Sequence, residues 1–149
     1  MKIAIGADHG GYGLKEILKA KLKSEGHTVI DCGTYDENSC HYPIYAKAVC
    51  EEIQKGSAER GILCCGTGIG MSIAANKMRG IRAAVCSDPY SAKFTRLHND
   101  SNVLCLGARV IEPALAEELV DIFLTTEAEG GRHNERIKMI AEIEEAERK

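Results

Sequence analysis

The chain alternates short apolar runs with helical patterns, and this alternation constrains its fold more than any other feature. The apolar runs cover residues 2–7, 27–32, 61–65, 81–86 and 102–106. Each is followed by a segment in which apolar residues recur at spacings of three and four, the period of an amphipathic helix. Alternating strands and helices form a parallel sheet with helices on both faces. We therefore predict a three-layer α/β/α fold around a doubly wound, five-stranded parallel sheet.

Glycine and proline bound the expected helices. Gly26 and Gly56 follow the first two helical patterns, and Pro43, Pro89 and Pro113 stand where later helices are expected to begin. Proline is favoured in the first turn of a helix and glycine just after its last turn. A last helix is expected from about residue 132, and no repeat or linker interrupts the chain. We therefore expect one domain over residues 1–149.

Charge and cysteine usage narrow the class of protein. The net charge is −3 and basic runs are absent, so no nucleic-acid partner is expected. The apolar runs are too short to span a membrane, and the N-terminus begins with a strand-like segment rather than a secretory signal. The seven cysteines are odd in number and lie mostly in apolar runs, which suits reduced thiols. We expect a cytoplasmic protein without a disulfide framework.

The segment after the third apolar run carries the strongest chemical signal. The run ends in a cysteine, and three glycines then alternate with other residues before a helical pattern begins. Glycine lets the backbone approach a ligand closely, and free N–H groups at a helix start bind anions and favour a thiolate. We interpret Cys65 as a functional thiol; the alternative is a buried structural cysteine, as expected for Cys64 on the opposite strand face. The residues of this segment are Cys65, Gly66, Thr67, Gly68, Ile69 and Gly70.

A nucleotide site is the alternative interpretation of these glycines. A P-loop requires a Lys-Ser or Lys-Thr pair at a spacing that is missing here. The dinucleotide fingerprint requires three glycines after the first strand, but Gly11 and Gly13 supply only two and Glu16 stands in the third place. Asp31 ends the second strand, where a ribose-binding acid would stand, but an isolated Asp is common there. No paired Cys/His spacing of a zinc site occurs either, so no metal site is predicted.

Further reactive side chains follow other strands. Asp8 and His9 come after the first strand, Arg109 comes after the fifth, and the helix after the fourth ends in His98-Asn99. Ligands bind beyond the carboxyl ends of parallel strands, so we expect these groups at the same edge of the sheet as the glycine segment. Together they suit acid–base chemistry near neutral pH. The alternatives are a helix cap for Asp8 and a dipole interaction for His98.

Two arginines open the last expected helix. Arg132 and Arg136 are four residues apart, so they share a helix face. Two glycines precede them, and both the helix start and the guanidinium groups suit a phosphate. With Arg109 they would form a site for a dianion. The alternative is a solvated face on which the arginines pair with nearby glutamates.

These segments together resemble type B ribose-5-phosphate isomerase, a family that also includes allose-6-phosphate and galactose-6-phosphate isomerases. The similarity covers essentially the whole chain and rests on residues 8–9, 65–70, 72–77, 86–91, 98–100 and 130–133. It implies aldose–ketose isomerisation of a sugar phosphate through a cis-enediolate, most specifically ribose 5-phosphate to ribulose 5-phosphate in the pentose phosphate pathway. It also implies that neither a metal nor an organic cofactor takes part.

The resemblance assigns a role to each candidate residue. Cys65 would move the proton between C2 and C1, and His98 would open the furanose ring with help from Asp8. Thr67 would handle hydroxyl protons, and Asn99 and Tyr42 would bind the substrate. The anion hole would consist of Gly66, Thr67, Gly68, Ile69 and Gly70. The phosphate would be held by His9, Arg109, Arg132 and Arg136.

Two positions of this chain differ from the residues that relatives carry there. Some relatives carry a glutamate base where this chain has Met71, so Cys65 keeps that role; His41 stands where many have aspartate.

The family implies a homodimer with each site built across the interface and the C-terminal helix reaching toward the partner. Pairing of dimers into tetramers stays open. Two alternatives also remain: an allose-6-phosphate isomerase, and a non-catalytic sugar-phosphate or nucleotide binding module that would need neither Cys65 nor His98.

Overall fold

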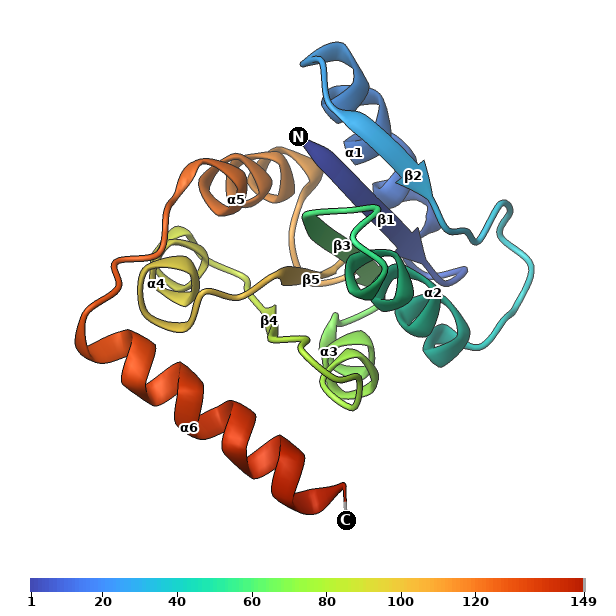
Figure 1. Cartoon of the computed structure of the whole chain (residues 1–149). Helices are drawn as coiled ribbons and strands as arrows, with labels where there is room; N and C mark the ends of the chain where they lie inside the picture. Colours follow the sequence, from blue (N-terminus) through green and yellow to red (C-terminus); the bar gives the residue numbers. More distant parts are fainter. Residues whose placement is uncertain (149) are drawn as a thin grey trace.

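The five apolar runs form one parallel sheet. The computed structural model describes residues 1–148. The strands are β1 (Lys2–Ala7), β2 (Thr28–Asp31), β3 (Arg60–Cys65), β4 (Ala83–Val85) and β5 (Val103–Gly107). They pair in the order β2-β1-β3-β5-β4, and every pair is parallel (Figure 1). The predicted five-stranded parallel sheet is therefore confirmed.

The edge strand β4 is shorter than the predicted run over residues 81–86. The N–H of Ile81 donates to the carbonyl of Met78 in a turn, at 3.2 Å, so the chain enters the sheet later. The amide of Asn76 then bonds both backbone groups of Ala83, at 2.8 and 2.9 Å. These side-chain bonds take the place of a strand partner on the open edge.

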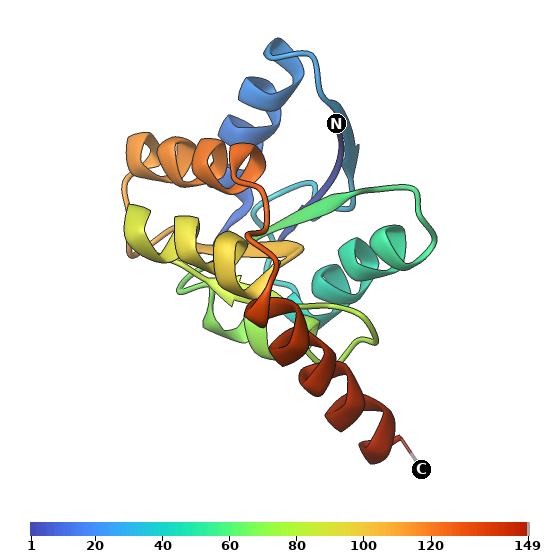
Figure 2. The same ribbon diagram turned by 60° about the vertical axis from the view of Figure 1, so that its left-hand side comes forward.

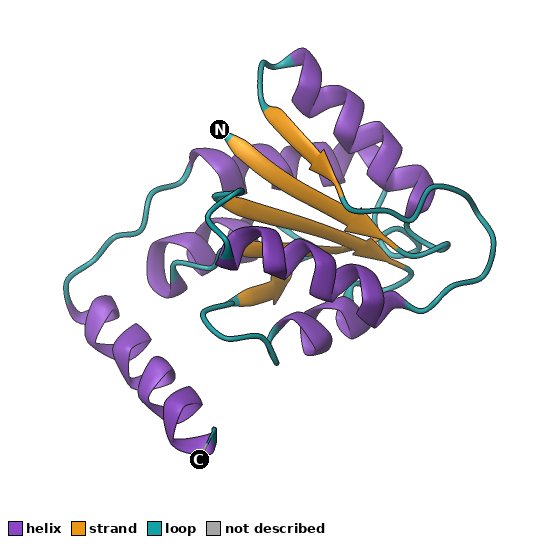
Figure 3. Ribbon diagram, turned by 45° about the vertical axis from the view of Figure 1, so that its right-hand side comes forward, coloured by secondary structure: helices purple, strands orange, loops and turns teal. Residues whose placement is uncertain are grey.

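Helices cover both faces of the sheet, as predicted (Figures 2 and 3). One face packs against α1 (Tyr12–Ser24), α4 (Pro89–Asn99) and α5 (Pro113–Thr125). The other packs against α2 (Tyr42–Gln54) and α3 (Ile69–Ala75). Prolines lie in the first turns of α2, α4 and α5, which confirms three of the predicted helix starts. Within residues 1–148, no helix combines the length and the apolar character that a membrane span requires.

Alternation along the strands builds two cores. In β1, Ile3 and Ile5 face the α1–α5 side, whereas Ala4 faces α2. All three side chains are fully buried. Successive residues of a strand point to opposite faces, so a sheet covered on both sides needs continuous apolar runs. This is why the strands read as unbroken apolar segments in the sequence.

The last helix, α6 (Arg132–Glu147), extends away from the sheet (Figures 1 and 3). The N–H of Glu129 donates to the carbonyl of Leu97 at 3.0 Å, which fixes the start of α6 to the end of α4. His133 is the buried residue of this helix, whereas Met139 and Ile143 are 60% and 65% exposed. Between α6 and the body lies a groove of about 720 Å³. An apolar face of α6 thus remains uncovered by the other residues of the described range.

A buried ion pair joins α1 to the end of β2. Lys15 is fully buried, and its Nζ lies 2.8 and 2.9 Å from the two carboxylate oxygens of Asp31. Lys19 donates to the same carboxylate at 2.9 Å. Desolvation by itself raises the pKa of Asp31, but the hydrogen bonds from the two lysines more than offset this effect, so the pKa lies below its ordinary value.

We predict that Asp31→Asn lowers the free energy of unfolding by roughly 3 kcal/mol at pH 7, because it leaves a buried ammonium without its main partner. The folded-state pKa of Asp31 is depressed, so this stabilisation is present above the unfolded pKa of about 3.9 and is lost as the pH falls through the folded value. Urea unfolding from pH 7 down to pH 3 measures both effects.

The matched control is Asp121→Asn, which removes a 54% exposed carboxylate paired with Lys21. It should change the free energy of unfolding by less than about 1 kcal/mol. Equal losses in the two variants would contradict the role assigned to the buried pair.

Candidate active site

Cys65 is the last residue of β3 and faces the α2–α3 side of the sheet. Its neighbour Cys64 packs on the opposite side, among α1 and α5. Cys65 is 6% exposed, and its Sγ accepts the N–H of Gly68 at 3.1 Å. A backbone donor aimed at sulfur stabilises negative charge there. The thiol and a loop N–H therefore meet where the strand ends.

Gly68 can make this contact because it has no side chain. Its φ is +81°, a left-handed conformation that other residues rarely adopt. A Cβ at this position would also lie 2.9 Å from the carbonyl carbon of Leu106 and 2.9 Å from Val85. Glycine is therefore needed both for the turn and for the close approach to β5.

Two further predicted residues line the same loop. The Oγ1 of Thr67 accepts the N–H of Ile69 at 3.2 Å, which orders the turn into α3. The ring of Tyr42 lies over Gly70, where an added Cβ would come within 2.7 Å of it. The structure thus brings Tyr42 from the start of α2 to the glycine loop.

The turn after β1 lies beside this loop. The Oδ1 of Asp8 accepts the N–H groups of Gly10 and Gly11 at 2.9 and 3.1 Å. Asp8 therefore orders the turn before α1, and its backbone N–H donates to the carbonyl of Cys64 at 3.2 Å. The Nδ1 of His9 accepts the N–H of Cys40 at 3.2 Å. Both candidate residues lie at the carboxyl edge of the sheet, as predicted.

Arg109 belongs to the same group. Its N–H donates to the carbonyl of Gly66 at 3.0 Å. Its guanidinium lies next to Gly10 and Gly66, where added Cβ atoms would stand 3.4 and 3.1 Å away from it. The carboxyl edge therefore combines a thiol, a carboxylate, an imidazole, a guanidinium and loop N–H groups.

The expectation that His98 and Asn99 share this edge is wrong within one chain. The helix α4 returns the chain to the amino ends of the strands, and Asn102 accepts there from the N–H of Gly61 at 2.9 Å. Gly61 and Cys65 lie near opposite ends of β3. His98 and Asn99, at the end of α4, are therefore separated from Cys65 by about the length of a strand.

Arg132 and Arg136 lie on the His98 side, in the first turns of α6. The ring of His133, in the same turn, stacks on the ring of His98 with centroids 4.1 Å apart. The structure therefore divides the predicted phosphate ligands: these two arginines lie apart from Arg109. The candidate site residues form two groups at opposite edges of the sheet.

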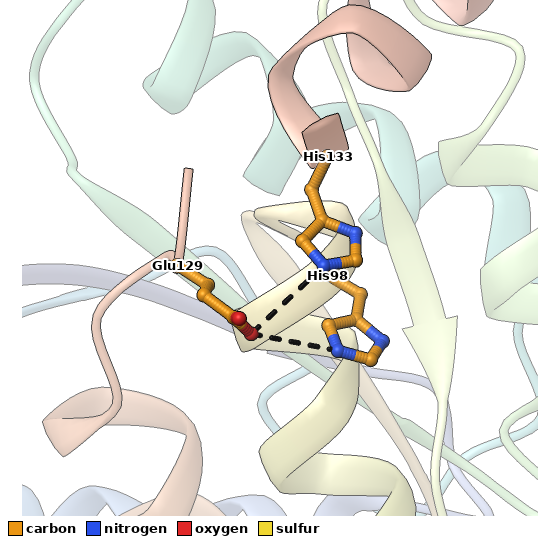
Figure 4. A group of neighbouring side chains, drawn as sticks. All are labelled: His98, Glu129 and His133. Atoms are coloured by element: carbon orange, nitrogen blue, oxygen red, sulfur yellow. Dashed lines mark ion pairs between the residues drawn. The ribbon is translucent and has the colours of Figure 1, made fainter. Parts of the chain in front are cut away.

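The second group includes two residues that sequence reasoning did not identify as functional. Glu129 Oε2 lies 3.6 Å from Nε2 of His98 and 3.9 Å from Nε2 of His133 (Figure 4). Burial and then the neighbouring His98 lower the pKa of His133, so its imidazole is neutral at pH 7. The spacing of four residues between Glu129 and His133 indicates in the sequence that the two side chains can be neighbours. Their contact with His98 depends on the tertiary structure.

Four of the other cysteines belong to the two hydrophobic cores. All seven thiols are free. Burial raises the pKa of Cys64 and Cys105 far above the ordinary value, raises that of Cys50 to about 12 and raises that of Cys86 to about 11. These four thiols stay protonated at neutral pH, as expected for residues that only fill the core.

Comparison with known proteins gives consistent matches over nearly the whole chain. Residues 3–140 match the family model described as Ribose/Galactose Isomerase. Ribose-5-phosphate isomerase B of Escherichia coli (strain K12) is 50% identical over 144 residues, with 97% of each chain covered. A putative sugar phosphate isomerase of Bacillus subtilis (strain 168), YwlF, is 50% identical over 146 residues, with 97% of this chain and 98% of the relative covered.

Solved structures give the same result. Clostridium thermocellum ribose-5-phosphate isomerase B has a TM-score of 0.97 at 51% identity, covering 98% of this chain and 99% of the other. Ribose-5-phosphate isomerase B from Mycoplasma genitalium, solved with bound ribulose-5-phosphate, has a TM-score of 0.93 at 39% identity, covering 97% and 96%.

We predict that Gly11→Ala destabilises the protein by about 1–3 kcal/mol or more, because a Cβ there would lie 2.2 Å from the carbonyl oxygen of Cys64. Gly13→Ala is the matched control, since a Cβ there meets nothing within 4 Å. It should stabilise α1 by roughly 0.5–1 kcal/mol. Urea unfolding of both variants checks the two signs, and the same sign for both would be evidence against this packing.

Proposed function

Because this chain belongs to the ribose/galactose isomerase family, we propose that it interconverts ribose 5-phosphate and ribulose 5-phosphate through a cis-enediolate. The contact between the Sγ of Cys65 and the N–H of Gly68 carries this assignment, because it joins a base to a donor for an anion. The relatives' names favour ribose 5-phosphate over allose 6-phosphate and over a non-catalytic binding module. Residues 1–149 then act as one domain in the cytoplasmic pentose phosphate pathway, without metal or organic cofactor.

Cys65 acts as the base on the open-chain sugar. The thiolate removes the proton from C2, the electron pair forms the C1–C2 double bond, and negative charge develops on O1. The same thiol returns the proton to C1, while Thr67 passes the hydroxyl proton between the oxygens. A positioned base contributes about 10²–10⁴-fold to the rate.

The N–H groups of the loop over residues 66–70 stabilise the enediolate, apart from those of Gly68 and Ile69, which already donate to Cys65 and Thr67. This charge exists only during the reaction, so the donors lower the energy of the transition state more than that of the bound sugar. One such donor is typically worth roughly 3–4 kcal/mol. Asp8, His9, Tyr42 and Arg109 surround the same loop and hold the sugar and its phosphate from that side.

The second group supplies ring opening and the rest of the phosphate site. His98 protonates the ring oxygen of the furanose, with help from Asp8 at the other edge. Asn99 binds the substrate, and Arg132 and Arg136 bind the phosphate bidentately. Holding the remote phosphate in place positions C1 and C2 over the thiol.

A homodimer unites the two groups. Because Cys65 and His98 lie near opposite ends of the sheet in one chain, a substrate can contact both only if a second copy supplies one of them. A two-fold symmetric pair forms two such sites at once. The exposed apolar residues of α6 and the groove of about 720 Å³ beside it offer the surface for this contact.

We predict that Cys65→Ala lowers kcat at least about 10³-fold while substrate binding survives, because the base is lost but the phosphate ligands remain. A coupled ribulose 5-phosphate assay and calorimetric titration with ribose 5-phosphate measure the two quantities. Cys50→Ala removes a buried thiol from α2 and serves as the control, with near-normal turnover expected. Near-normal turnover in Cys65→Ala would rule out this base.

We also predict that two inactive variants, Cys65→Ala and His98→Ala, restore activity when they are unfolded together and refolded. Random pairing makes half of the dimers mixed, and each mixed dimer has one intact site out of two, so about a quarter of the wild-type activity returns. If each site were built within one chain, every site in the mixture would carry a lesion and no activity would return.

A further inference from the structure

Three side chains from separate segments converge beside α4. His98 comes from the last turn of α4, Glu129 from the segment before α6, and His133 from the first turn of α6 (Figure 4). Their ligand atoms all lie within 4.8 Å of one another. The distances from the Glu129 carboxylate to the two imidazoles, 3.6 and 3.9 Å, are too long for hydrogen bonds. They are close to the separation of about 3.4 Å between ligand atoms of a tetrahedral zinc site.

His133 points to a missing ligand. The residue is 4% exposed, and its Nε2 has no hydrogen-bond partner. Buried polar atoms of folded proteins are nearly always paired, so an unpaired ring nitrogen needs an explanation. Figure 4 shows this nitrogen directed toward the carboxylate of Glu129.

We propose that His98, Glu129 and His133 form a binding site for a divalent transition metal such as Zn²⁺. Two imidazoles and one carboxylate are a common set of three protein ligands for zinc, with the fourth position left to water. Imidazole donors also favour Co²⁺ and Ni²⁺, whereas Mg²⁺ and Ca²⁺ prefer all-oxygen sites.

Metal binding requires one rearrangement. The two rings are stacked with planes 12° apart, so their lone pairs run nearly parallel instead of meeting at one point. A rotation of the His98 side chain that tilts its ring out of the stack would let the lone pair of its Nε2 converge with that of His133. The His98 and Glu129 side chains are 38% and 55% exposed, which leaves room for this adjustment while the buried His133 stays in place.

The consequence for activity rests on the proposed function. If His98 opens the sugar ring through its Nε2, a metal on that nitrogen prevents it from donating the proton. The metal then inhibits the enzyme, and a chelator restores it. The metal would thus control the isomerase without taking part in the reaction.

Co²⁺ titration of the full-length protein tests the binding site. One Co²⁺ per chain should bind, without the near-ultraviolet charge-transfer band that thiolate ligation adds, and Zn²⁺ should displace it. Glu129→Gln and His133→Gln should each weaken binding by at least ~10-fold. His27→Gln, which removes an imidazole remote from the cluster, should bind like the wild type. A thiolate band, or unchanged binding in the Glu129→Gln variant, would overturn the site.

Circular dichroism and Zn²⁺ inhibition distinguish misfolding, loss of the inhibitory role and failure of the proposed function. Circular dichroism shows whether each variant folds, and Glu129→Gln provides a test at an exposed position if His133→Gln does not fold. Zn²⁺ inhibition of the isomerase should need at least ~10-fold more metal in Glu129→Gln than in His27→Gln. Equal inhibition of both would refute the inhibitory role. Absence of isomerase activity in the metal-free wild type would instead refute the proposed function and leave the Co²⁺ result standing.

Discussion

The path of the chain from each parallel strand into the following helix determines at which edge of the sheet a reactive side chain lies. A residue at the end of a strand or shortly after it, such as Cys65 or Arg109, stays at the carboxyl edge of the sheet. A residue at the far end of the following helix, such as His98, has been carried back to the amino edge. The connection between parallel strands always crosses the sheet in this way, so one chain separates the two groups by the length of a strand.

Much of the fold could be predicted from the sequence because local rules and tertiary structure agree. Apolar runs buried on both faces became strands, and Pro43, Pro89 and Pro113 marked helix starts. The carboxyl-edge group was also predictable, since each member directly follows a strand or packs on the glycine loop. The prediction that His98 lies at the carboxyl edge was wrong, because His98 is in the last turn of α4 and that helix runs back to the amino edge. The contact of His98 with Glu129 joins residues far apart in sequence, which no local pattern encodes.

Buried arginines fix the geometry of the second group. The Nε of Arg96 donates to the carbonyl of Thr126 at 3.1 Å, which ties the segment before α6 to α4. The guanidinium groups of Arg60 and Arg96 lie 5.5 and 5.7 Å from the ring of Phe123, on α5. Cation–π contacts of this kind favour a planar guanidinium that is also hydrogen-bonded. The side chains of His98 and Glu129 therefore depend on a rigid support rather than on a free loop.

The exposed apolar face of α6 makes the behaviour of the protein in solution depend on its concentration. Met139 and Ile143 face water in an isolated chain, and side chains of this size are solvated poorly. An isolated chain therefore exposes an apolar flank that favours adsorption and aggregation. Because aggregation needs encounters between chains, the fraction of the protein lost in this way would rise with its concentration.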